Sequence, residues 1–526
     1  MRELVAHQVL WRTANESPGV EIVSPPHRFT YADLHERSIR LANGLRQRGI
    51  GRGSVVGVLD VNTHRYLELH YALSMLGAVL HTLNFRLPVD DLLYTVQHAG
   101  DEWLLVGEGF EKLAAAADPL VARRVWLTDA AQSPRPGEPT LEELIAESPA
   151  AVPPEANAVS ENDILSIFYT TGTTGRPRGM RYRHRDMLLA SLQILHHLAL
   201  HRGGAEVSAA DTFMPLIPFF HIHAWGTAFF VPYLGARLVL PGRADPAGQL
   251  DLIRREGVTF ANLVPTQLHM LLAANDVADG GALPLKVLTG GSPFPRGLAQ
   301  RAWQKGVRYS LIYGGSDQLA TAISVAPPGD PESDAAQELL RTGTVPLPMV
   351  EVEVRGVNGA PVPRDGATIG ELHVRSPWLP PEGYYRDTER SREAYREGWF
   401  ASGDLAVRLP GGQVYVVDRE RDAIKSGGEW IPSAVLEAVI SEHPRVAAAA
   451  VLSAPDERWG ERPVAVVQPS GKLDVEELAA LLRRAADEGR LAKFWVPERI
   501  VLVEQIPITS AGKIHKAALR SQVGLA

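Results

Sequence analysis

Residues 169–179 are the most informative stretch of this sequence, and they read YTTGTTGRPRG. Gly172 and Gly175 lie among four threonines, and Arg176 and Arg178 follow them. Glycine lets a backbone approach a ligand closely, while exposed N–H groups, hydroxyls and guanidinium groups can surround a phosphate. The common P-loop needs Gly-Lys followed by Ser or Thr, which this stretch lacks. We therefore predict a phosphate-binding loop of another kind, since a plain surface turn would not require four threonines.

The composition is that of an ordinary globular protein: 45% of the 526 residues are hydrophobic and 22% are charged. This length exceeds what one hydrophobic core supports, so two or more domains are expected. The formal net charge of -8 argues against a general nucleic-acid binder. Because the chain has no cysteine, it cannot form disulfides, thiolate nucleophiles or zinc–thiolate sites.

The sequence shows neither a signal peptide nor a membrane span. Residues 1–19 include Glu3, Arg12 and Glu16 and lack the apolar stretch of a signal peptide. No run reaches the roughly 18 uninterrupted apolar residues of a membrane-spanning helix. We therefore expect a cytoplasmic protein without integral membrane association.

The first third of the chain alternates helical and strand patterns. Thr30 and Asp33 predict the capped start of a helix, and residues 66–76 predict another. Residues 54–59 and 78–82 are short apolar runs typical of buried strands. Helices that alternate with such strands predict layered α/β subdomains with mainly parallel sheets.

The last hundred or so residues have a different character. Short strand patterns flank an amphipathic helix predicted over residues 475–486, and the end is basic around Lys513 and Lys516. We predict a large N-terminal α/β domain over residues 1–420 and a small α+β domain over residues 421–526.

Several segments together carry a resemblance to a known family. Residues 169–179 resemble the phosphate loop of the ANL superfamily of adenylate-forming enzymes: acyl-CoA synthetases, adenylation domains and beetle luciferases. Further segments resemble the family's motifs, in the family's order: LTGGSP at 288–293, YGGSD at 313–317, GELHVR at 370–375, GWFASGD at 398–404, DRERDAIKSGGE at 418–429 and PITSAGK at 507–513. An ordered set over nearly the whole chain is far more specific than one glycine-rich match.

The resemblance implies roles for individual residues. It implies nucleotide binding by Thr170, Thr171, Gly172, Thr173, Thr174, Gly175 and Arg178 at the phosphates, by Gly290, Gly291, Ser292, Tyr313 and Gly314 at the adenine, and by Asp404 and Arg419 at the ribose. It implies catalytic roles for Ser316, Asp317, Lys425 and Lys513, a hinge at Arg421, and a coenzyme A tunnel formed by Ser426, Gly427 and Gly428. In the family the small domain rotates at the hinge, so that Lys513 serves adenylation and the Lys425 segment serves thioester formation.

These residue types suit the chemistry independently of the resemblance. A carboxylate is a poor electrophile, and transfer of AMP to it creates a good leaving group. That transfer needs Mg²⁺ to bridge phosphate oxygens and a cation where negative charge develops. Lys513, on a loop after Gly512, is a suitable cation, although most lysines near a chain end are simply solvated.

Two departures from the family pattern concern one pair of residues and one single residue. Ser316-Asp317 replace the usual Thr-Glu pair, and Arg178 replaces a lysine. Aspartate is shorter than glutamate by one carbon–carbon bond, roughly 1.5 Å, and Mg²⁺ demands near-ideal geometry. Arginine keeps the charge of lysine in a different shape. Both departures affect ATP handling, so adenylation is the half-reaction that they bring into question.

The acid-binding residues are predicted from residues 218–225, which read PFFHIHAW and resemble the family segment that gates the acyl tunnel. His221, Trp225 and Gly315 are the predicted acid-side residues, and the aromatic rings could equally be core packing. These rings favour a bulky apolar acid, either a fatty acid or an aryl or polycyclic acid. His221 with His223, and the group His196, His197 and His201, lack a nearby acidic partner in the sequence, so we do not predict a metal site there.

The function predicted from the sequence is that of an acid–thiol ligase, an AMP-forming acyl-CoA synthetase. Its ligands would be ATP, Mg²⁺, coenzyme A and a carboxylic acid or its adenylate, and a homodimer is compatible with the pattern. One alternative is a partial enzyme that mainly performs thioester formation on a preformed adenylate. Others are a carrier-protein loader, an oxygenase that uses the same adenylate, and a non-catalytic binding protein, against which Lys513, Asp404, Arg419 and Lys425 argue.

Overall fold

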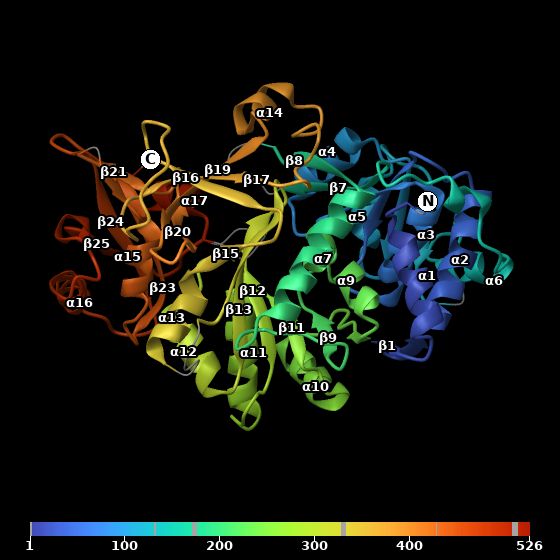
Figure 1. Ribbon diagram of the computed structural model, residues 1–526, viewed down its shortest axis with the longest axis horizontal. Coiled ribbons are helices and arrows are strands. Elements are labelled where there is room, and N and C mark those ends of the chain that lie inside the picture. Colours follow the sequence, from blue (N-terminus) through green and yellow to red (C-terminus); the bar gives the residue numbers. More distant parts are fainter. Residues whose placement is uncertain are drawn as a thin grey trace.

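The computed structural model describes residues 3–130, 133–170, 176–327, 333–427, 429–507 and 514–525. Within these ranges the strands form three sheets. Figure 1 shows the N-terminal sheet with its helices at the right, the largest sheet in the middle and the C-terminal sheet at the left. The molecule is therefore an α/β body with a small α+β part at its C-terminal end, as the sequence predicts.

The N-terminal sheet has the strand order β6-β5-β3-β4-β7-β8 and is parallel except for its last pair. Its strands are β3 (Val55–Leu59), β4 (Val79–Thr82), β5 (Trp103–Gly107), β6 (Arg124–Leu127), β7 (Ile164–Thr170) and β8 (Arg178–Arg183). Its helices are α2 (Tyr31–Gln47), α3 (His64–Leu76), α4 (Val89–Ala99), α5 (Glu111–Ala116), α6 (Leu141–Glu147) and the 3₁₀ turn η1 (Pro154–Asn157). Thr30 and Asp33 form the predicted capping box at the start of α2.

The largest sheet follows the order β16-β17-β19-β20-β15-β14-β13-β12-β11-β9-β10-β1-β2. Its strands are β1 (Glu21–Ser24), β2 (His27–Thr30), β9 (Thr212–Pro215), β10 (Arg237–Val239), β11 (Phe260–Leu263), β12 (Lys286–Gly290), β13 (Arg308–Gly315), β14 (Leu319–Ser324), β15 (Thr344–Pro346), β16 (Glu351–Arg355), β17 (Gly370–Arg375), β19 (Trp399–Arg408) and β20 (Val414–Arg419), with β18 (Tyr395–Arg396) beside β19. Its helices are α7 (His184–Leu200), α8 (Ile222–Trp225), α9 (Thr227–Leu234), α10 (Pro246–Glu256), α11 (Pro265–Ala278), α12 (Arg296–Gln304), α13 (Asp334–Thr342) and α14 (Thr388–Ala394), while α1 (Ala6–Glu16) packs against α2, α3 and α9.

Strand direction changes in the middle of this sheet. From β1 through β10, β9, β11 and β12 to β13 the neighbours are parallel, whereas every pair from β13 to β16 is antiparallel. The prediction of mainly parallel sheets thus describes the first part of the chain and not the strands after β13. Antiparallel neighbours need no crossover helix, and short turns join β13 to β14 and β19 to β20.

The C-terminal sheet is formed by β21 (Ile424–Ser426), β22 (Glu429–Ile431), β23 (Val446–Asp456), β24 (Gly460–Pro469) and β25 (Arg499–Leu502). Helices α15 (Ser433–Ile440), α16 (Val475–Asp487) and α17 (Lys516–Gln522) and the 3₁₀ turn η2 (Lys493–Trp495) accompany it. Leu436 of α15 and Leu478 of α16 are fully buried in the apolar core that these elements share with the sheet. The amphipathic helix predicted over residues 475–486 is thus α16.

Asp418, near the end of β20, joins the largest sheet to this small part. Its Oδ2 accepts hydrogen bonds from the Ser433 hydroxyl at 2.7 Å, from the Ala434 N–H at 3.3 Å and from the Ser433 N–H. These are the first N–H groups of α15, which no residue of the helix itself can satisfy. The chain leaves the largest sheet at Arg419 and enters the small one at Ile424; the boundary at residue 420 stays a prediction.

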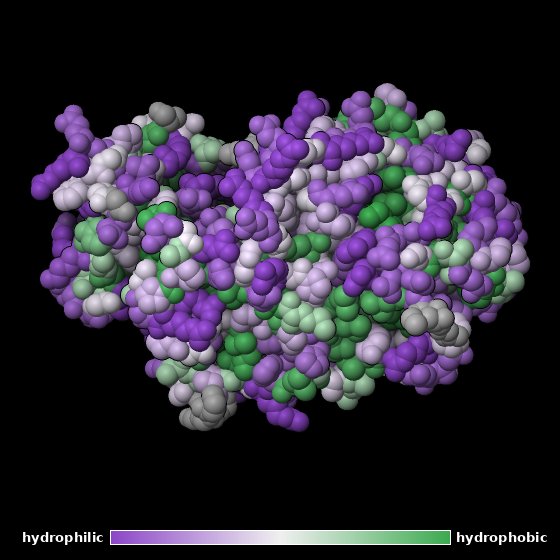
Figure 2. All heavy atoms as spheres, turned by 45° about the horizontal axis from the view of Figure 1, so that its top comes forward, coloured by the Kyte–Doolittle hydropathy of each residue, from purple (hydrophilic) through white to green (hydrophobic). Residues whose placement is uncertain are grey.

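The described helices include none that is both long and apolar enough to cross a membrane. On the face shown in Figure 2, hydrophilic side chains predominate and hydrophobic ones occur in separate patches.

Candidate active site

The candidate site lies at the carboxyl ends of the parallel strands β9, β11, β12 and β13. In open α/β sheets, ligands bind at this edge, where loops replace the sheet. Residues 216–225 follow β9, residues 291–295 follow β12, and Ser316 and Asp317 follow β13. Three segments predicted separately from the sequence therefore share one edge, next to the change from parallel to antiparallel pairing.

Tyr313, Asp404 and Arg419 form the first group at this edge. The Tyr313 hydroxyl donates a hydrogen bond to Oδ2 of Asp404 at 2.7 Å. Asp404 and Arg419 are register partners on β19 and β20, and Nε of Arg419 lies 3.6 Å from Oδ1 of Asp404. Burial and the Asp404 carboxylate raise the pKa of Tyr313 well above its usual value. An aromatic ring, a carboxylate and a guanidinium group are thereby joined in one polar cluster.

Two of the predicted adenine-side glycines are required by strand packing. A Cβ on Gly290 would lie 2.2 Å from the Ile312 carbonyl oxygen on β13. A Cβ on Gly314 would lie 2.2 Å from the Leu319 carbonyl oxygen, at the irregular β13–β14 pairing. Gly291 has φ +79°, and Ser292 beside it is half-buried. Only glycine leaves room for these backbone contacts. Strand packing therefore requires glycine at positions 290 and 314, whatever their role in nucleotide binding.

Arg178, Tyr384 and Asp317 form the second group. The Arg178 Nη1 lies 3.3 Å from the Tyr384 hydroxyl, and the guanidinium group stacks over the Tyr384 ring at 5.2 Å. The same hydroxyl bonds to the Asp317 carboxylate. Burial raises the pKa of Asp317, while the Tyr384 hydroxyl and the guanidinium groups of Arg178 and Arg419 oppose that rise. Asp317 and Arg178, which both differ from the family pattern, therefore interact with the same side chain, that of Tyr384.

Sequence reasoning missed three tyrosines of this site. Besides Tyr384, the Tyr395 hydroxyl donates to the Asp317 carbonyl oxygen at 2.7 Å, and the Tyr182 hydroxyl donates to the Ser316 carbonyl oxygen at 2.5 Å. They lie on different elements, and no spacing in the sequence relates them to residues 316–317.

The phosphate loop itself is described only at its ends. Thr170 ends β7 opposite Arg178, which begins β8. Thr171, Gly172, Thr173, Thr174 and Gly175 lie outside the described residues, as do Gly428 and Lys513. The predicted roles of these seven residues stay predictions.

The predicted hinge and tunnel residues follow on the C-terminal side. Arg421 lies between β20 and β21, with its side chain 41% exposed. Partial removal from water and then the charge of Arg419 lower its pKa, while Asp422 and Asp404 raise it. Lys425 is exposed, with its ammonium group 5.4 Å from the centre of the Trp430 ring. Arg421 thus lies near Asp404 and Arg419, whereas Lys425 lies on β21 of the C-terminal sheet.

Ser426 and Gly427 belong to the same hairpin. The Ser426 hydroxyl is buried and accepts a hydrogen bond from Arg462 at 3.3 Å. Gly427 has φ +61°, and a Cβ there would lie 2.9 Å from the Trp459 ring. A side chain at position 427 would thus be strained and crowded, which suits a backbone that must stay narrow.

The predicted acid-side segment contains an unusual turn. Ile222, His223, Ala224 and Trp225 have φ values of 50°, 51°, 52° and 56°, so α8 is a left-handed turn of four residues, none of them glycine. The left-handed conformation costs about 1–2 kcal/mol per residue, and a β-branched residue such as Ile222 is especially rare in it. The Trp225 N–H bonds to the His221 carbonyl at 3.2 Å, and the turn packs against β14. Strain of this kind persists only where surrounding contacts enforce it, and it concentrates at functional sites.

The two histidines of this turn have different environments. His221 and Trp225 are half-buried, whereas His223 is fully buried and bonded to His70 at 2.8 Å and to Ser166 at 3.0 Å. Both ring nitrogens of His223 are therefore engaged by protein groups. Gly315, the remaining predicted acid-side residue, is half-buried at the end of β13.

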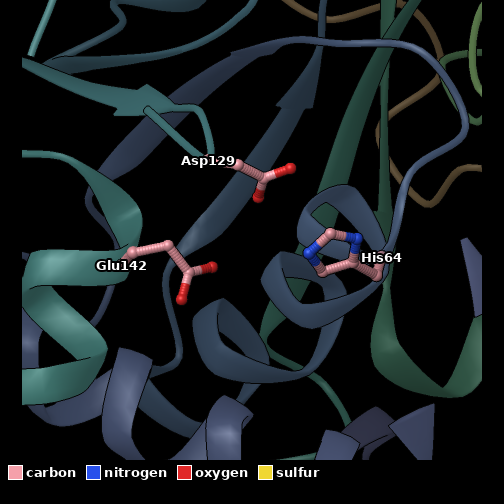
Figure 3. Close-up of side chains that lie close together, drawn as sticks. All are labelled: His64, Asp129 and Glu142. Carbon is pink, nitrogen blue, oxygen red and sulfur yellow. The ribbon is translucent and has the colours of Figure 1, made fainter. Parts of the chain in front are cut away.

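A group that could hold a metal ion occurs elsewhere in the described residues. Figure 3 shows His64, Asp129 and Glu142 facing one another from α3, from the segment after β6 and from α6. Arg65 lies 2.5 Å from Asp129, and Arg37 lies 2.6 Å from Glu142. Because each carboxylate already has its own guanidinium partner, this group is an ion-pair cluster that links α2, α3 and α6.

Comparison with known proteins shows the family of this chain. Residues 10–385 match the AMP-binding enzymes, and residues 435–513 match the C-terminal domain of AMP-binding enzymes. The chain belongs to the AMP-binding enzymes. The long-chain-fatty-acid–CoA ligase of Thermus thermophilus is 38% identical to it over 508 residues, which cover 94% of this chain and 90% of that one. The medium-chain-fatty-acid–CoA ligase of Ectopseudomonas oleovorans is 32% identical, with 99% and 95% covered.

Solved structures agree with the family. An amide bond synthetase from Marinactinospora thermotolerans is 27% identical, with a TM-score of 0.83, and 98% of this chain and 99% of that chain are covered. The predicted adenylate-forming fold and acid–thiol ligase are thus confirmed for this AMP-binding enzyme, whose family uses ATP and coenzyme A. The alternative of a partial enzyme has no support.

Proposed function

We propose that this AMP-binding enzyme joins a bulky hydrophobic carboxylic acid to coenzyme A through an acyl-adenylate, using ATP and Mg²⁺. The observation that carries the proposal is the hydrogen bond of the Tyr313 hydroxyl to Asp404, whose neighbour across the strands is Arg419. The Tyr313 ring would lie against the adenine, while the carboxylate and guanidinium group would accept from and donate to the ribose hydroxyls.

The other nucleotide contacts surround this group. The Thr170 to Gly175 loop and Arg178 would bind the phosphates, and Gly290, Gly291, Ser292 and Gly314 would border the adenine. Lys513 would stabilise the charge that develops during adenylation, when a carboxylate oxygen attacks the α-phosphorus and pyrophosphate leaves. After rotation at Arg421, Lys425 and Ser426 to Gly428 would line the path of the coenzyme A thiol, which attacks the acyl carbon and releases AMP.

The residues at the end of β13 fit a magnesium ion. Asp317 offers carboxylate oxygens, the donors that Mg²⁺ prefers. Burial disfavours the charged form of this carboxylate, so a nearby divalent cation would stabilise it. Ser316 and Asp317 would hold the ion, and the ion would neutralise phosphate charge.

The acid would lie beside His221, Trp225 and Gly315. His221 and Trp225 are half-buried at a turn that packs against β14, the strand that follows Asp317 in the β13–β14 hairpin. The fatty-acid ligase relatives and the aromatic composition of this segment favour a hydrophobic acid. A cytoplasmic location, a homodimer and the division at residue 420 are further parts of the proposal, which fractionation, light scattering and limited proteolysis can test.

The experiment is a substrate panel. The purified chain is incubated with ATP, Mg²⁺, coenzyme A and one acid at a time, from short to long saturated acids and aryl acids. AMP and acyl-CoA should form in equal amounts with at least one hydrophobic acid. Formation of adenylate without consumption of coenzyme A would contradict the proposal, and faster turnover with an added amine would indicate amide-bond formation instead, as in the amide bond synthetase.

A further inference from the structure

Hydrogen bonds of the buried His223 side chain hold the left-handed turn of α8 (Ile222–Trp225) in place. Nδ1 of His223 lies 2.8 Å from Nε2 of His70 on α3, and Nε2 of His223 lies 3.0 Å from the Ser166 hydroxyl on β7. Both His70 and Ser166 are buried in the N-terminal subdomain. The turn that carries the acid-side residues is thereby tied to a helix and a strand of a neighbouring sheet.

The hydrogen-bond partners determine which ring nitrogens of His70 and His223 carry a proton. Nδ1 of His70 lies 2.7 Å from the Tyr66 carbonyl oxygen, which can only accept, so His70 carries its proton on Nδ1. Nε2 of a neutral His70 is then an acceptor, and Nδ1 of His223 must donate to it. Nε2 of His223 becomes an acceptor in turn, and the Ser166 hydroxyl donates to it. Every group is satisfied when both rings are uncharged.

Burial agrees with this arrangement. It lowers the pKa of His70 to about 4 and lowers the pKa of His223 well below its usual value, with a further lowering from the neighbouring ring. Phe168 and Phe229 pack edge-on against His223. The pair is thus an uncharged, fully paired polar contact inside an aromatic cluster, and such contacts fix one geometry more sharply than apolar packing alone.

Two further contacts hold the backbone of the turn. The Ala224 carbonyl oxygen accepts from the Asn262 amide at 2.6 Å and from the Thr227 hydroxyl at 2.9 Å. Next to the turn, a Cβ on Gly226 would lie 2.4 Å from the Ser191 hydroxyl oxygen. The neighbours therefore determine the backbone on both sides of His223, while His223 itself is the side-chain anchor.

We propose that His223, held by His70 and Ser166, is a positioning residue that sets where His221 and Trp225 meet the acid, and thereby which acids the enzyme prefers. This inference rests on the proposed acyl-CoA ligase function. His223 points away from the acid-side residues into the core, so it acts through the shape of the turn and does not touch the reacting atoms.

The test compares Michaelis constants in the complete reaction. His223→Phe keeps the ring volume and removes both hydrogen bonds. We expect KM for straight-chain saturated acids to rise about tenfold, with an altered preference between short and long acids, while KM for ATP and coenzyme A stays within about twofold. His223→Asn retains an N–H donor near the position of Nδ1 and should restore most of the acid affinity.

A matched control is a histidine that bonds to α3, the helix that carries His70. His7 is also buried and bonded to a serine, with its Nδ1 3.0 Å from the Ser74 hydroxyl of α3. His7→Phe should lower thermal stability and leave the acid preference unchanged. If His223→Phe does not fold, Ser166→Ala provides the same readout with a rise of about threefold.

The outcomes separate the inference from the function on which it rests. An unchanged acid KM and acid preference in folded His223→Phe or Ser166→Ala, or an equal rise of all three Michaelis constants, would overturn the positioning role. Equal effects of His223→Asn and His223→Phe would also do so. Failure of the wild-type enzyme to activate any acid of the panel would instead overturn the ligase function, and the inference with it.

Discussion

The hydroxyl of Tyr313 on β13 lies 2.7 Å from Oδ2 of Asp404 on β19, although β14, β15 and β20 separate the two strands in the sheet. The contact joins the motif at residues 313–317 to the motif at residues 398–404. The proposed adenine-side and ribose-side residues are thereby connected within the protein itself. Such preorganisation reduces the ordering that nucleotide binding would otherwise require.

Loss of the Tyr313 hydroxyl should lower the catalytic efficiency of the enzyme with ATP. A hydrogen bond to a charged group contributes about 1.5–3 kcal/mol, and Arg419 still faces Asp404, so we take the lower end. Tyr313→Phe should then lower kcat/KM for ATP about tenfold, while KM for the acid changes little. Steady-state kinetics with ATP as the varied substrate measure this.

Tyr309→Phe is the matched control for that variant. Tyr309 is buried on the same strand, and its hydroxyl donates to the Gln337 carbonyl oxygen at 3.3 Å, away from Asp404. It should leave kcat/KM for ATP unchanged. Equal losses in both variants would mean that the Tyr313 effect is one of general stability.

Tyr384→Phe should shift the pH dependence of adenylation. Burial raises the pKa of Asp317 and the Tyr384 hydroxyl opposes that rise, so removing the hydroxyl raises the pKa further. Asp317 is proposed to act as a carboxylate, so activity is lost as pH falls through its pKa. The acidic limb of kcat/KM against pH should therefore move to higher pH in the variant. The neighbouring Tyr385→Phe serves as control, and an acidic limb at its wild-type position in Tyr384→Phe would refute the role of Asp317.

Lys513→Ala should separate the half-reactions. A single charge-stabilising group contributes about a hundredfold to a thousandfold in rate. Acid-dependent exchange of pyrophosphate into ATP should fall by that factor, whereas transfer of a synthetic acyl-adenylate to coenzyme A should persist. Lys493→Ala, at a lysine whose side chain is 84% exposed, is the control. Equal losses in both half-reactions would remove the specific role of Lys513.

Arg421→Pro should also separate the half-reactions, for a different reason. Proline fixes φ near −65°, and a pivot at this residue must change its backbone angles. One half-reaction should survive and the other should slow strongly, whereas Arg421→Ala should retain both. Wild-type rates of both half-reactions in Arg421→Pro would locate the hinge elsewhere.

Local signals in the sequence predicted individual elements well. The Thr30–Asp33 capping box, the strand predicted at residues 54–59 and the helix at residues 475–486 all form as expected. In each case neighbouring residues carry the information, through capping, an apolar run or helical spacing.

Other features depend on contacts between distant residues. Ile222 to Trp225 include no glycine or asparagine, so nothing local favours a left-handed turn there. His70 and Ser166 enforce it from 153 and 57 residues away in the sequence. The meeting of Tyr384 with Asp317 and Arg178 has the same origin. Periodicity could not reveal these arrangements, because tertiary packing creates them.

The most direct test of the central claim follows one oxygen atom. The enzyme is given an acid labelled with ¹⁸O in its carboxylate, together with ATP, Mg²⁺ and coenzyme A, and the products are weighed by mass spectrometry. If the carboxylate attacks the α-phosphorus and coenzyme A then displaces AMP, each AMP formed carries one labelled oxygen and pyrophosphate carries none. Unlabelled AMP, or label in inorganic phosphate, would contradict an acyl-adenylate and with it the account given for this chain.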